Sequence, residues 1–367
     1  MQVLPRRALN RSLLERNLLL ERSDLPVTEA VEHVIGLQAQ EPQEPYLGLS
    51  ARLAGFDPTV ASALLESRAL VRILMMRRTV HLLSAPDALG LRTLHDPMLR
   101  RRMRGTLGPY LPGVDEHELA EACRPLLTEQ PLGLTEAARR VADRWPGVEP
   151  RILGDACSTL LPLVQVPPRG LWRVSCPARC TTIDAWLGAE PPAIGAPGAI
   201  PAEEVVLRYL RAFGPAATAD IRAWSGLTGL PQVLKALAPD LRTYRDERGR
   251  LLWDHPEGTI PDAHRPAPPR FLPAFDNALL GYDDRTRVVA DEHRGISVAG
   301  ARALLVDGGV AATWTDERDG DAAVLRVRRL APFGSTRAER AVVAEGERVA
   351  AFLHPDAVSH EVVLPPQ

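Results

Sequence analysis

The hydrophobic pattern between Pro201 and Asp254 changes from a helical period to strict alternation. The run "PAEEVVLRYLRAFG" places apolar residues three and four apart, and "TADIRAWSG" and "LPQVLKALAPD" continue this spacing in two shorter segments. The next run, "LRTYRDERGRLLWD", alternates apolar and polar residues on both sides of a turn at Gly249. Three helices followed by a hairpin are the element order of a winged helix-turn-helix, so the pattern predicts one such module here.

A similar order of elements occurs twice more upstream. Residues 113–188 contain three helical runs, the first of which is "DEHELAEACRPLL", and then "LVQVPPRGLWRV", which we interpret as a hairpin. Residues 1–112 contain helical runs such as "PVTEAVEHVIGL" before a second hairpin pattern, "LVRILMMRRTVHLLS". We therefore predict three tandem winged helix-turn-helix modules, at 1–112, 113–188 and 201–256, with Pro/Gly-rich linkers at 188–201 and 255–270.

Residues 268–367 show mostly strand patterns. The runs "RFLPAFDNALLGYDDRTRVV" and "GGVAATWTDERDGDAAVLRVRRL" alternate, and the second contains a turn at Asp319 and Gly320. The run "STRAERAVVAEGERVAAFL" is helical and begins at a cap, Ser335 or Thr336. The expected fold is α+β and mostly helical, with a small β-rich C-terminal domain packed on the winged helices.

The composition is that of a globular protein in a reducing compartment. Hydrophobic residues make up 45% and charged residues 25% of the chain, and no apolar run approaches the roughly 20 residues that a membrane span needs. The N-terminus lacks both an uninterrupted apolar segment and a cleavage site, so we expect a cytoplasmic protein that does not contact the membrane. The four cysteines are too few for a disulfide framework, and Cys176 and Cys180 lack a second ligand pair at a metal-site spacing.

Arginine supplies nearly all of the positive charge. The net charge is only −2 and Lys235 is the only lysine, so any DNA-binding surface must be local. Nine arginines lie between Arg68 and Arg104, against two acidic residues, Asp87 and Asp96. We interpret this segment as a phosphate-binding surface, and the alternative is a solvated helix face. The residues expected to contact DNA here are Arg77, Arg78, Arg100, Arg101 and Arg102.

The run "VIGLQAQEPQEPYLGL", from Val34 to Leu49, places uncharged amides where an apolar helix ends. Pro42 disfavours the helical conformation at Glu41, so we expect the helix to end near Gln38. In an extended segment, residues two apart share a face, so the amides of Gln38 and Gln40 can converge on one point. From the residues alone, two explanations stay open: the amides cap the helix end, or they form a polar functional site.

The amide-rich run is also part of a wider resemblance. The runs "GLQAQEPQEPYLGLSARLAGF", "RRTVHLLSAPD" and "LPAFDNALLGYDDRTRVV" resemble the AlkZ-like bacterial winged-helix family of alkylpurine and crosslink-repair DNA glycosylases, over essentially the whole chain. In that family a Gln, an aliphatic residue and a second Gln or Asp form the catalytic signature, which here falls on Gln38, Ala39 and Gln40. The resemblance implies a C-shaped clamp of three winged helices whose partner is double-stranded DNA carrying N7-alkylpurine adducts or crosslinks. We expect a monomer without a cofactor, associated with the nucleoid.

The chemistry of the substrate agrees with these roles. Alkylation at N7 gives the purine a positive charge, so the base can leave without being protonated and no strong general acid is required. The remaining tasks are to hold a water molecule against C1′ and to stabilise the charge that develops on the sugar, and amide oxygens can do both without titrating. We therefore predict a monofunctional glycosylase in which Gln38 and Gln40 are catalytic, and Glu41, Glu44 and Tyr46 shape the pocket.

Three assignments stay open at this point. Arg285 and Arg287 either point from a C-terminal hairpin toward the duplex or pair with Asp283 and Asp284. His81, in an apolar run, is more typical of a core residue than of a DNA contact. Winged helices most often serve in transcription, so a non-catalytic winged-helix DNA-binding transcription regulator is the alternative function. The sequence shows no evident effector pocket or dimerisation helix, although the C-terminal helix "ERAVVAEGERVAAFL" could pair. A protein-binding scaffold is the third hypothesis, and it would leave the arginine cluster unexplained.

Overall fold

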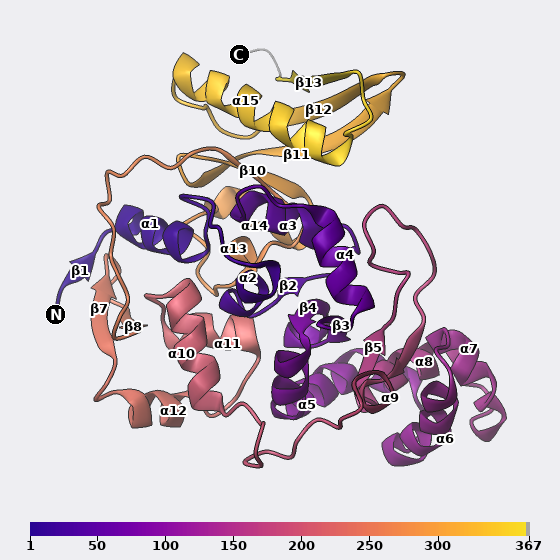
Figure 1. Cartoon of the computed structure of the whole chain (residues 1–367). Helices are drawn as coiled ribbons and strands as arrows, with labels where there is room; N and C mark the ends of the chain where they lie inside the picture. Colours follow the sequence, from indigo (N-terminus) through magenta and orange to yellow (C-terminus); the bar gives the residue numbers. More distant parts are fainter. Residues whose placement is uncertain (365–367) are drawn as a thin grey trace.

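The computed structural model describes residues 1–364 and combines helices with three sheets in that range, which confirms the α+β class (Figure 1). In the N-terminal part, helices precede a hairpin and a long helix. These elements are β1 (Val3–Leu4), α1 (Arg6–Arg16), α2 (Val27–His33), β2 (Leu37–Gln38), α3 (Glu44–Arg52), α4 (Pro58–Glu66), β3 (Leu70–Leu74), η1 (Met76–Arg78), β4 (Val80–Ser84) and α5 (Ala85–Leu107).

Helix α2 ends earlier than the sequence pattern predicts. It stops at His33, and Ile35 and Gly36 then adopt left-handed backbone conformations with φ of 54° and 84°. Glycine tolerates this conformation, and the space is also restricted, because a Cβ atom at Gly36 would lie 2.5 Å from Leu83 Cδ2. The turn leads the chain directly into β2, so Gln38 lies in a strand and the expectation of a helix end at this residue is wrong.

The strand that carries Gln38 forms the edge of a five-stranded sheet in the order β2-β4-β3-β5-β6. β2 pairs with β4 and sets Gln38 opposite His81. β3 and β4 form the predicted hairpin, which η1 closes. β3 also pairs with β5 (Leu163–Gln165), which pairs in turn with β6 (Cys180–Thr182). One sheet therefore joins the first and second segments of the chain.

Residues 113–188 contain the expected helices but not the expected hairpin. The helices from residue 108 onward are η2 (Gly108–Tyr110), α6 (Glu116–Glu129), α7 (Leu134–Arg139), η3 (Ala142–Arg144), α8 (Pro150–Leu160) and α9 (Ile183–Leu187). The run "LVQVPPRGLWRV" does not fold back on itself, because only β5 is a strand and its partner within this segment is β6. Pro167 and Pro168 have no N–H to donate to a ladder. Trp172 packs instead against Tyr46 and Phe352, with ring centroids 4.9 Å apart in each pair.

Residues 201–254 contain all the elements that the pattern predicts. α10 (Ala202–Phe213), α11 (Thr218–Ser225) and α12 (Leu230–Leu237) precede an antiparallel hairpin of β7 (Arg242–Asp246) and β8 (Leu251–Asp254). Tyr209, Phe213 and Trp224 are buried together in the helical core. β1 adds to β7 as a parallel strand, which attaches the N-terminus to this hairpin.

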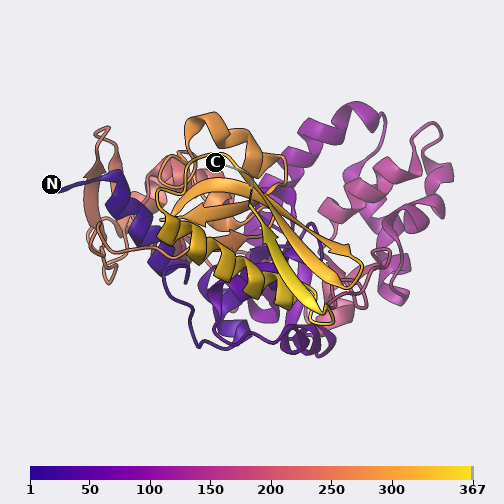
Figure 2. The same cartoon turned by 90° about the horizontal axis from the view of Figure 1, so that it is seen from above.

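The C-terminal part is a five-stranded sheet with a helix packed on it. Its elements are β9 (Arg270–Leu272), α13 (Asn277–Leu280), η4 (Asp291–His293), α14 (Arg294–Val298), β10 (Arg302–Val306), β11 (Gly309–Asp319), β12 (Ala322–Arg329), α15 (Thr336–Leu353) and β13 (Ser359–Val363). The strands are ordered β13-β12-β11-β10-β9, and α15 lies across them (Figure 2). Ser335 caps α15 by accepting from the Ala338 N–H at 3.2 Å, as expected.

The stretch from Leu272 to Val289 is less regular than predicted. After β9 the chain enters α13 rather than a second strand, because Asp276 caps this helix by accepting from the Ala278 N–H at 2.8 Å. Residues 281–290 are described and contain no strand. Arg285 and Arg287 therefore lie in irregular backbone and not in a hairpin.

The second and third segments flank the N-terminal part. Figure 1 shows α6 to α8 on one side of it and α10 to α12 on the other, with the C-terminal sheet above. Two buried ion pairs join the N-terminal part to the third segment and to the C-terminal part: Arg16 with Asp254 of β8 at 2.5 Å, and Arg52 with Asp276 at 2.8 Å. Breaking such a pair typically costs about 3–5 kcal/mol, because the remaining charge is left buried. Within residues 1–364, no helix is both long and apolar enough to cross a membrane.

Candidate active site

Gln38 is held in one orientation at the edge of the central sheet. The residue is 9% exposed, and its Oε1 accepts a hydrogen bond from Arg77 Nη2 at 3.0 Å. A guanidinium can only donate, so the oxygen of the amide, and not its nitrogen, must face Arg77. One lone pair of Oε1 remains for a second donor.

Gln40 is exposed and completes the pairing between β2 and β4. The backbone of Ala39 donates to the Val80 carbonyl at 2.7 Å, but the Ala39 carbonyl is taken by Arg72 Nη2 at 2.9 Å. The Val80 N–H donates instead to Gln40 Oε1 at 3.3 Å. The Gln40 amide is therefore also oriented with its oxygen toward the hairpin. Because both amides bond to the β3–β4 hairpin, capping of α2 does not account for them.

Arg77 connects Gln38 to two distant segments. It lies in η1 with a left-handed backbone, φ 57°, and is half-buried. Its guanidinium donates to Asn277 Oδ1 of α13 at 2.9 Å and to the Trp224 carbonyl of α11 at 3.2 Å. Burial lowers the pKa of Arg77 to about 10, and Arg102 and Arg285 contribute to this lowering. The group remains charged at neutral pH.

Two histidines beside this site are neutral. Burial, with Arg77, lowers the pKa of His81 to about 3, and burial lowers the pKa of His95 to about 4. His81 Nδ1 contacts the Thr79 carbonyl at 2.9 Å, which can only accept, so Nδ1 carries the proton and Nε2 is left as an acceptor toward Arg77 at 3.4 Å. His81 is thus a buried core residue, as interpreted from the sequence, and neither histidine can supply a proton at neutral pH.

The two histidines make stability depend on pH. An unfolded histidine has a pKa of 6.5, above both folded values, so the unfolded chain binds more protons between about pH 4 and 6.5. The free energy of unfolding should therefore fall as pH drops from 7 to 5, by about 2 kcal/mol for each histidine. Urea titrations across this range measure the slope. His95→Asn keeps a donor to the Leu91 carbonyl and should make the free energy of unfolding depend less steeply on pH. An unchanged slope in this variant would contradict the low pKa of His95.

The residues expected to shape the pocket lie in different environments. Glu41 is exposed. Glu44 is buried and accepts from Arg302 and from the Ala274 N–H, so it attaches α3 to the C-terminal part. Tyr46 is buried and donates to the Gly170 carbonyl at 2.7 Å. Glu44 and Tyr46 therefore have structural partners that the sequence pattern did not indicate.

The basic segment carries less free charge than its composition suggests. Arg78 pairs with Asp155 at 2.8 Å. Arg100 and Arg104 both pair with Glu116 of α6. Asp155 and Glu116 lie outside the segment from Arg68 to Arg104. A count of charges within this segment alone therefore overstates its free positive charge. Two adjacent arginines of α5, Arg101 and Arg102, are exposed, and within residues 1–364 neither forms an ion pair with a carboxylate.

Arg287 does not point outward. It is 5% exposed, donates to the Pro215 carbonyl at 3.0 Å and lies 4.0 Å from the Tyr282 ring centroid. Asp284 pairs with Arg248 and Arg250 of the β7–β8 hairpin. Burial and Arg294 lower the pKa of Arg285.

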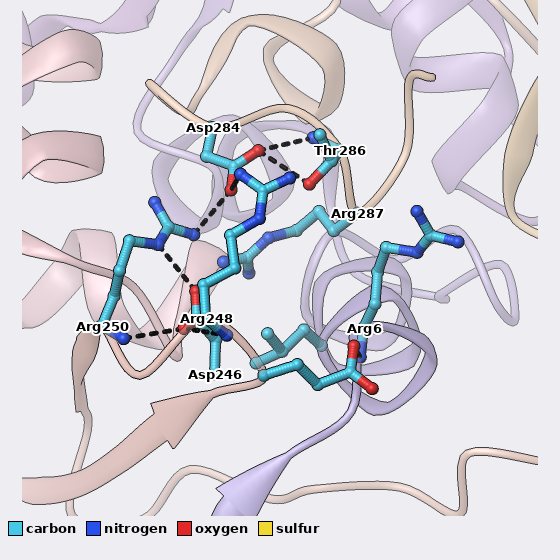
Figure 3. Close-up of a pocket in the computed structure, with 9 residues that line it drawn as sticks. Arg6, Asp246, Arg248, Arg250, Asp284, Thr286 and Arg287 are labelled. Atoms are coloured by element: carbon cyan, nitrogen blue, oxygen red, sulfur yellow. Dashed lines mark hydrogen bonds and ion pairs between the residues drawn. The ribbon is translucent and has the colours of Figure 1, made fainter. Parts of the chain in front are cut away.

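A small pocket opens next to Asp284. Figure 3 shows that it is lined by residues of α1, of the turn between β7 and β8, and of the segment around Asp284. Its volume is about 170 Å³, and two of the arginines that line it, Arg248 and Arg250, pair with Asp284, while Arg250 also pairs with Asp246. Gln38 and Gln40 do not line it, so this pocket and the amide pair are separate features.

The cysteines are all free. Cys123, Cys157 and Cys180 are buried, and Cys176 is half-buried. Within residues 1–364, no group of three or more His, Cys, Asp or Glu side chains is placed to hold a metal ion.

Comparison with known proteins identifies the class. The family described as "DNA glycosylase AlkZ-like" matches residues 31–352, and the chain belongs to this family. Family membership confirms the resemblance and supports DNA as the substrate. Among solved structures, the Streptomyces sahachiroi DNA glycosylase AlkZ is similar, with a TM-score of 0.78 and 22% sequence identity over 99% of this chain and 100% of that chain. The two proteins share their fold. The sequence matches none of the curated proteins with which it was compared.

Proposed function

We propose that this protein is a monofunctional DNA glycosylase that hydrolyses the N-glycosidic bond of N7-alkylated purines in duplex DNA. The observation that carries the proposal is the fixed orientation of two neutral amides, Gln38 and Gln40, in a chain of the AlkZ-like family. Each amide oxygen accepts one bond from the hairpin and has a second lone pair for a water molecule.

The reaction suits a site without a strong acid. When the C1′–N9 bond breaks, its electron pair neutralises the positive charge of the alkylated purine, which leaves as a neutral base. The oxygen of water then bonds to C1′, and the proton that it loses passes to solvent. Gln38 and Gln40 would hold this water and stabilise the positive charge on the sugar as it develops. The low pKa values of His81 and His95 are consistent with chemistry that needs no proton donor.

We propose that DNA contacts the exposed arginines of α5. Arg101 and Arg102 follow Arg100 on this helix, and Arg102 also donates to the Arg77 carbonyl at 3.3 Å, which connects this surface to the loop that holds Gln38. The proposed arrangement is a monomeric, C-shaped clamp of three winged helices around a duplex in the nucleoid, with the antiparallel pair β5–β6 as the wing of the second module. Interstrand crosslinks formed by a DNA-alkylating natural product are proposed substrates, because they also contain N7-alkylated purines.

The monofunctional mechanism is tested by the fate of the product strand. Glycosylases that also nick DNA form an imine between an enzyme amine and C1′, and Lys235 is the only lysine. This residue is exposed in α12. After incubation with a duplex containing one N7-methylguanine, we expect strand cleavage only when alkali or an abasic endonuclease is added. Borohydride should trap no covalent complex, and Lys235→Ala should retain base release. A trapped complex that this substitution abolishes would contradict direct attack by water.

A further inference from the structure

We propose that Arg77 and Asn277 are positioning residues that hold Gln38 in the orientation required for base release. The inference rests on the proposed catalytic role of Gln38. It assigns the C-terminal part of the chain a role in assembling the site, through α13.

One guanidinium nitrogen joins the two amides. Arg77 Nη2 donates to Gln38 Oε1 at 3.0 Å and to Asn277 Oδ1 at 2.9 Å. Arginine has no acceptor, so both amides must present their oxygens to it, and neither can rotate by 180° without breaking its bond. The planar guanidinium therefore fixes two side chains relative to each other, which a lysine ammonium does less well.

Asn277 also fixes the backbone that leads to Gln38. Its Nδ2 donates to the Gly36 carbonyl at 3.0 Å, two residues before Gln38, and Asn277 is fully buried. One side chain therefore supports both the left-handed turn that starts β2 and the guanidinium that orients the amide. Any displacement of α13 would be transmitted to Gln38 by both routes.

The acceptors around Arg77 are neutral. Besides the two amides, they are the Trp224 carbonyl and the unprotonated Nε2 of His81. Within residues 1–364, Arg77 has no ion pair with a carboxylate. A half-buried cation with neutral partners, on a left-handed backbone at φ 57°, is a costly arrangement that a purely structural contact does not require. Such costs are typical of residues whose geometry serves a functional site.

The test is a double-substitution cycle measured as single-turnover release of N7-methylguanine. Arg77→Lys keeps the charge but removes the planar bridge, so we expect the rate to fall by roughly 10–100-fold, the scale for misplacing a catalytic group by about 1 Å. Affinity for unmodified duplex should change little. Because Arg77 acts through Gln38, adding Arg77→Lys to Gln38→Ala should cause no further decrease in rate. Arg265→Lys, an ion-paired arginine bonded to Glu15, is the matched control and should retain the parental rate.

Asn277→Ala provides a second variant if Arg77→Lys does not fold. It should also slow base release in the parent protein, and it should cause no further decrease when added to Gln38→Ala. The proposal is overturned if either variant lowers the rate by the same factor in the Gln38→Ala background as in the parent. It is also overturned if both folded variants release the base at the parental rate while Gln38→Ala is slow. If Gln38→Ala itself is fully active, the proposed function of Gln38 fails, and this inference fails with it.

Discussion

Replacing Gln38 by alanine should slow base release by roughly one to three orders of magnitude, the scale for removing a group that positions water or stabilises charge. Gln38 is buried and oriented by Arg77, so the substitution removes a preorganised acceptor. Gln40→Ala should fall in the same range, because its oxygen is oriented by the Val80 N–H. Single-turnover assays on a duplex with one N7-methylguanine measure both effects.

The same loop provides a matched control. Gln43 bonds to the Leu171 carbonyl at 3.0 Å and to the Arg173 N–H at 2.8 Å, so its amide is bound outside the candidate site. Gln43→Ala should therefore retain the parental rate. If Gln38→Ala and Gln40→Ala are folded, bind DNA and excise as fast as the parent, the two amides are not catalytic.

Reversing the charges of Arg101 and Arg102 to glutamate should weaken binding to modified and unmodified duplexes alike. Arginines that bind phosphates read no base, and removing one such arginine should flatten the plot of log K against log salt by about one unit. Fluorescence anisotropy at several salt concentrations measures the slope. The paired Arg100 and Arg104 are expected to contribute less, because Glu116 already offsets their charge.

A control variant with the same change in net charge distinguishes local phosphate binding from the electrostatic field of the whole protein. Arg337 and Arg340 are exposed on α15, and reversing both should leave the salt slope nearly unchanged. Equal effects of the two double reversals would indicate a non-specific field effect. Weaker binding of modified DNA alone by the Arg101 and Arg102 variant would instead indicate that these residues read the lesion.

The elements that depend on local periodicity were predictable from the sequence. In residues 201–254, the apolar positions of each helix follow the helical period and those of each strand alternate. The predicted elements therefore agree with the structure one by one. The prediction of a hairpin in "LVQVPPRGLWRV" was wrong. The alternation is typical of strands, but Pro167 and Pro168 cannot donate the hydrogen bonds that a second strand would need. The strand predicted after Leu272 failed because a single cap, Asp276, starts a helix there.

The candidate site was only partly predictable. The family signature identifies Gln38 and Gln40, but the sequence does not predict the left-handed turn at Gly36 that leads into β2 and places Gln38 in that strand. The arginine-rich segment predicts a phosphate contact for Arg77, whereas its bonds to Gln38 and Asn277 depend on tertiary structure and leave no local signal in the sequence. Asn277 lies 200 positions from Arg77 in the chain, and its only signal in the sequence is that it follows Asp276 as one of two polar residues in the otherwise apolar run "AFDNALL".

Release of free base from a defined duplex tests the account most directly. The full-length protein is incubated with duplex DNA carrying a single N7-methylguanine, and the supernatant is analysed by chromatography, beside the Gln38→Ala, Gln40→Ala double variant and the same duplex without protein. The account predicts that the parent protein releases free N7-methylguanine well above the spontaneous rate and leaves an intact abasic strand, while the double variant stays close to the spontaneous rate. Binding of the duplex by a folded parent protein without any release of base above the spontaneous rate would contradict it, and would favour a non-catalytic DNA-binding role.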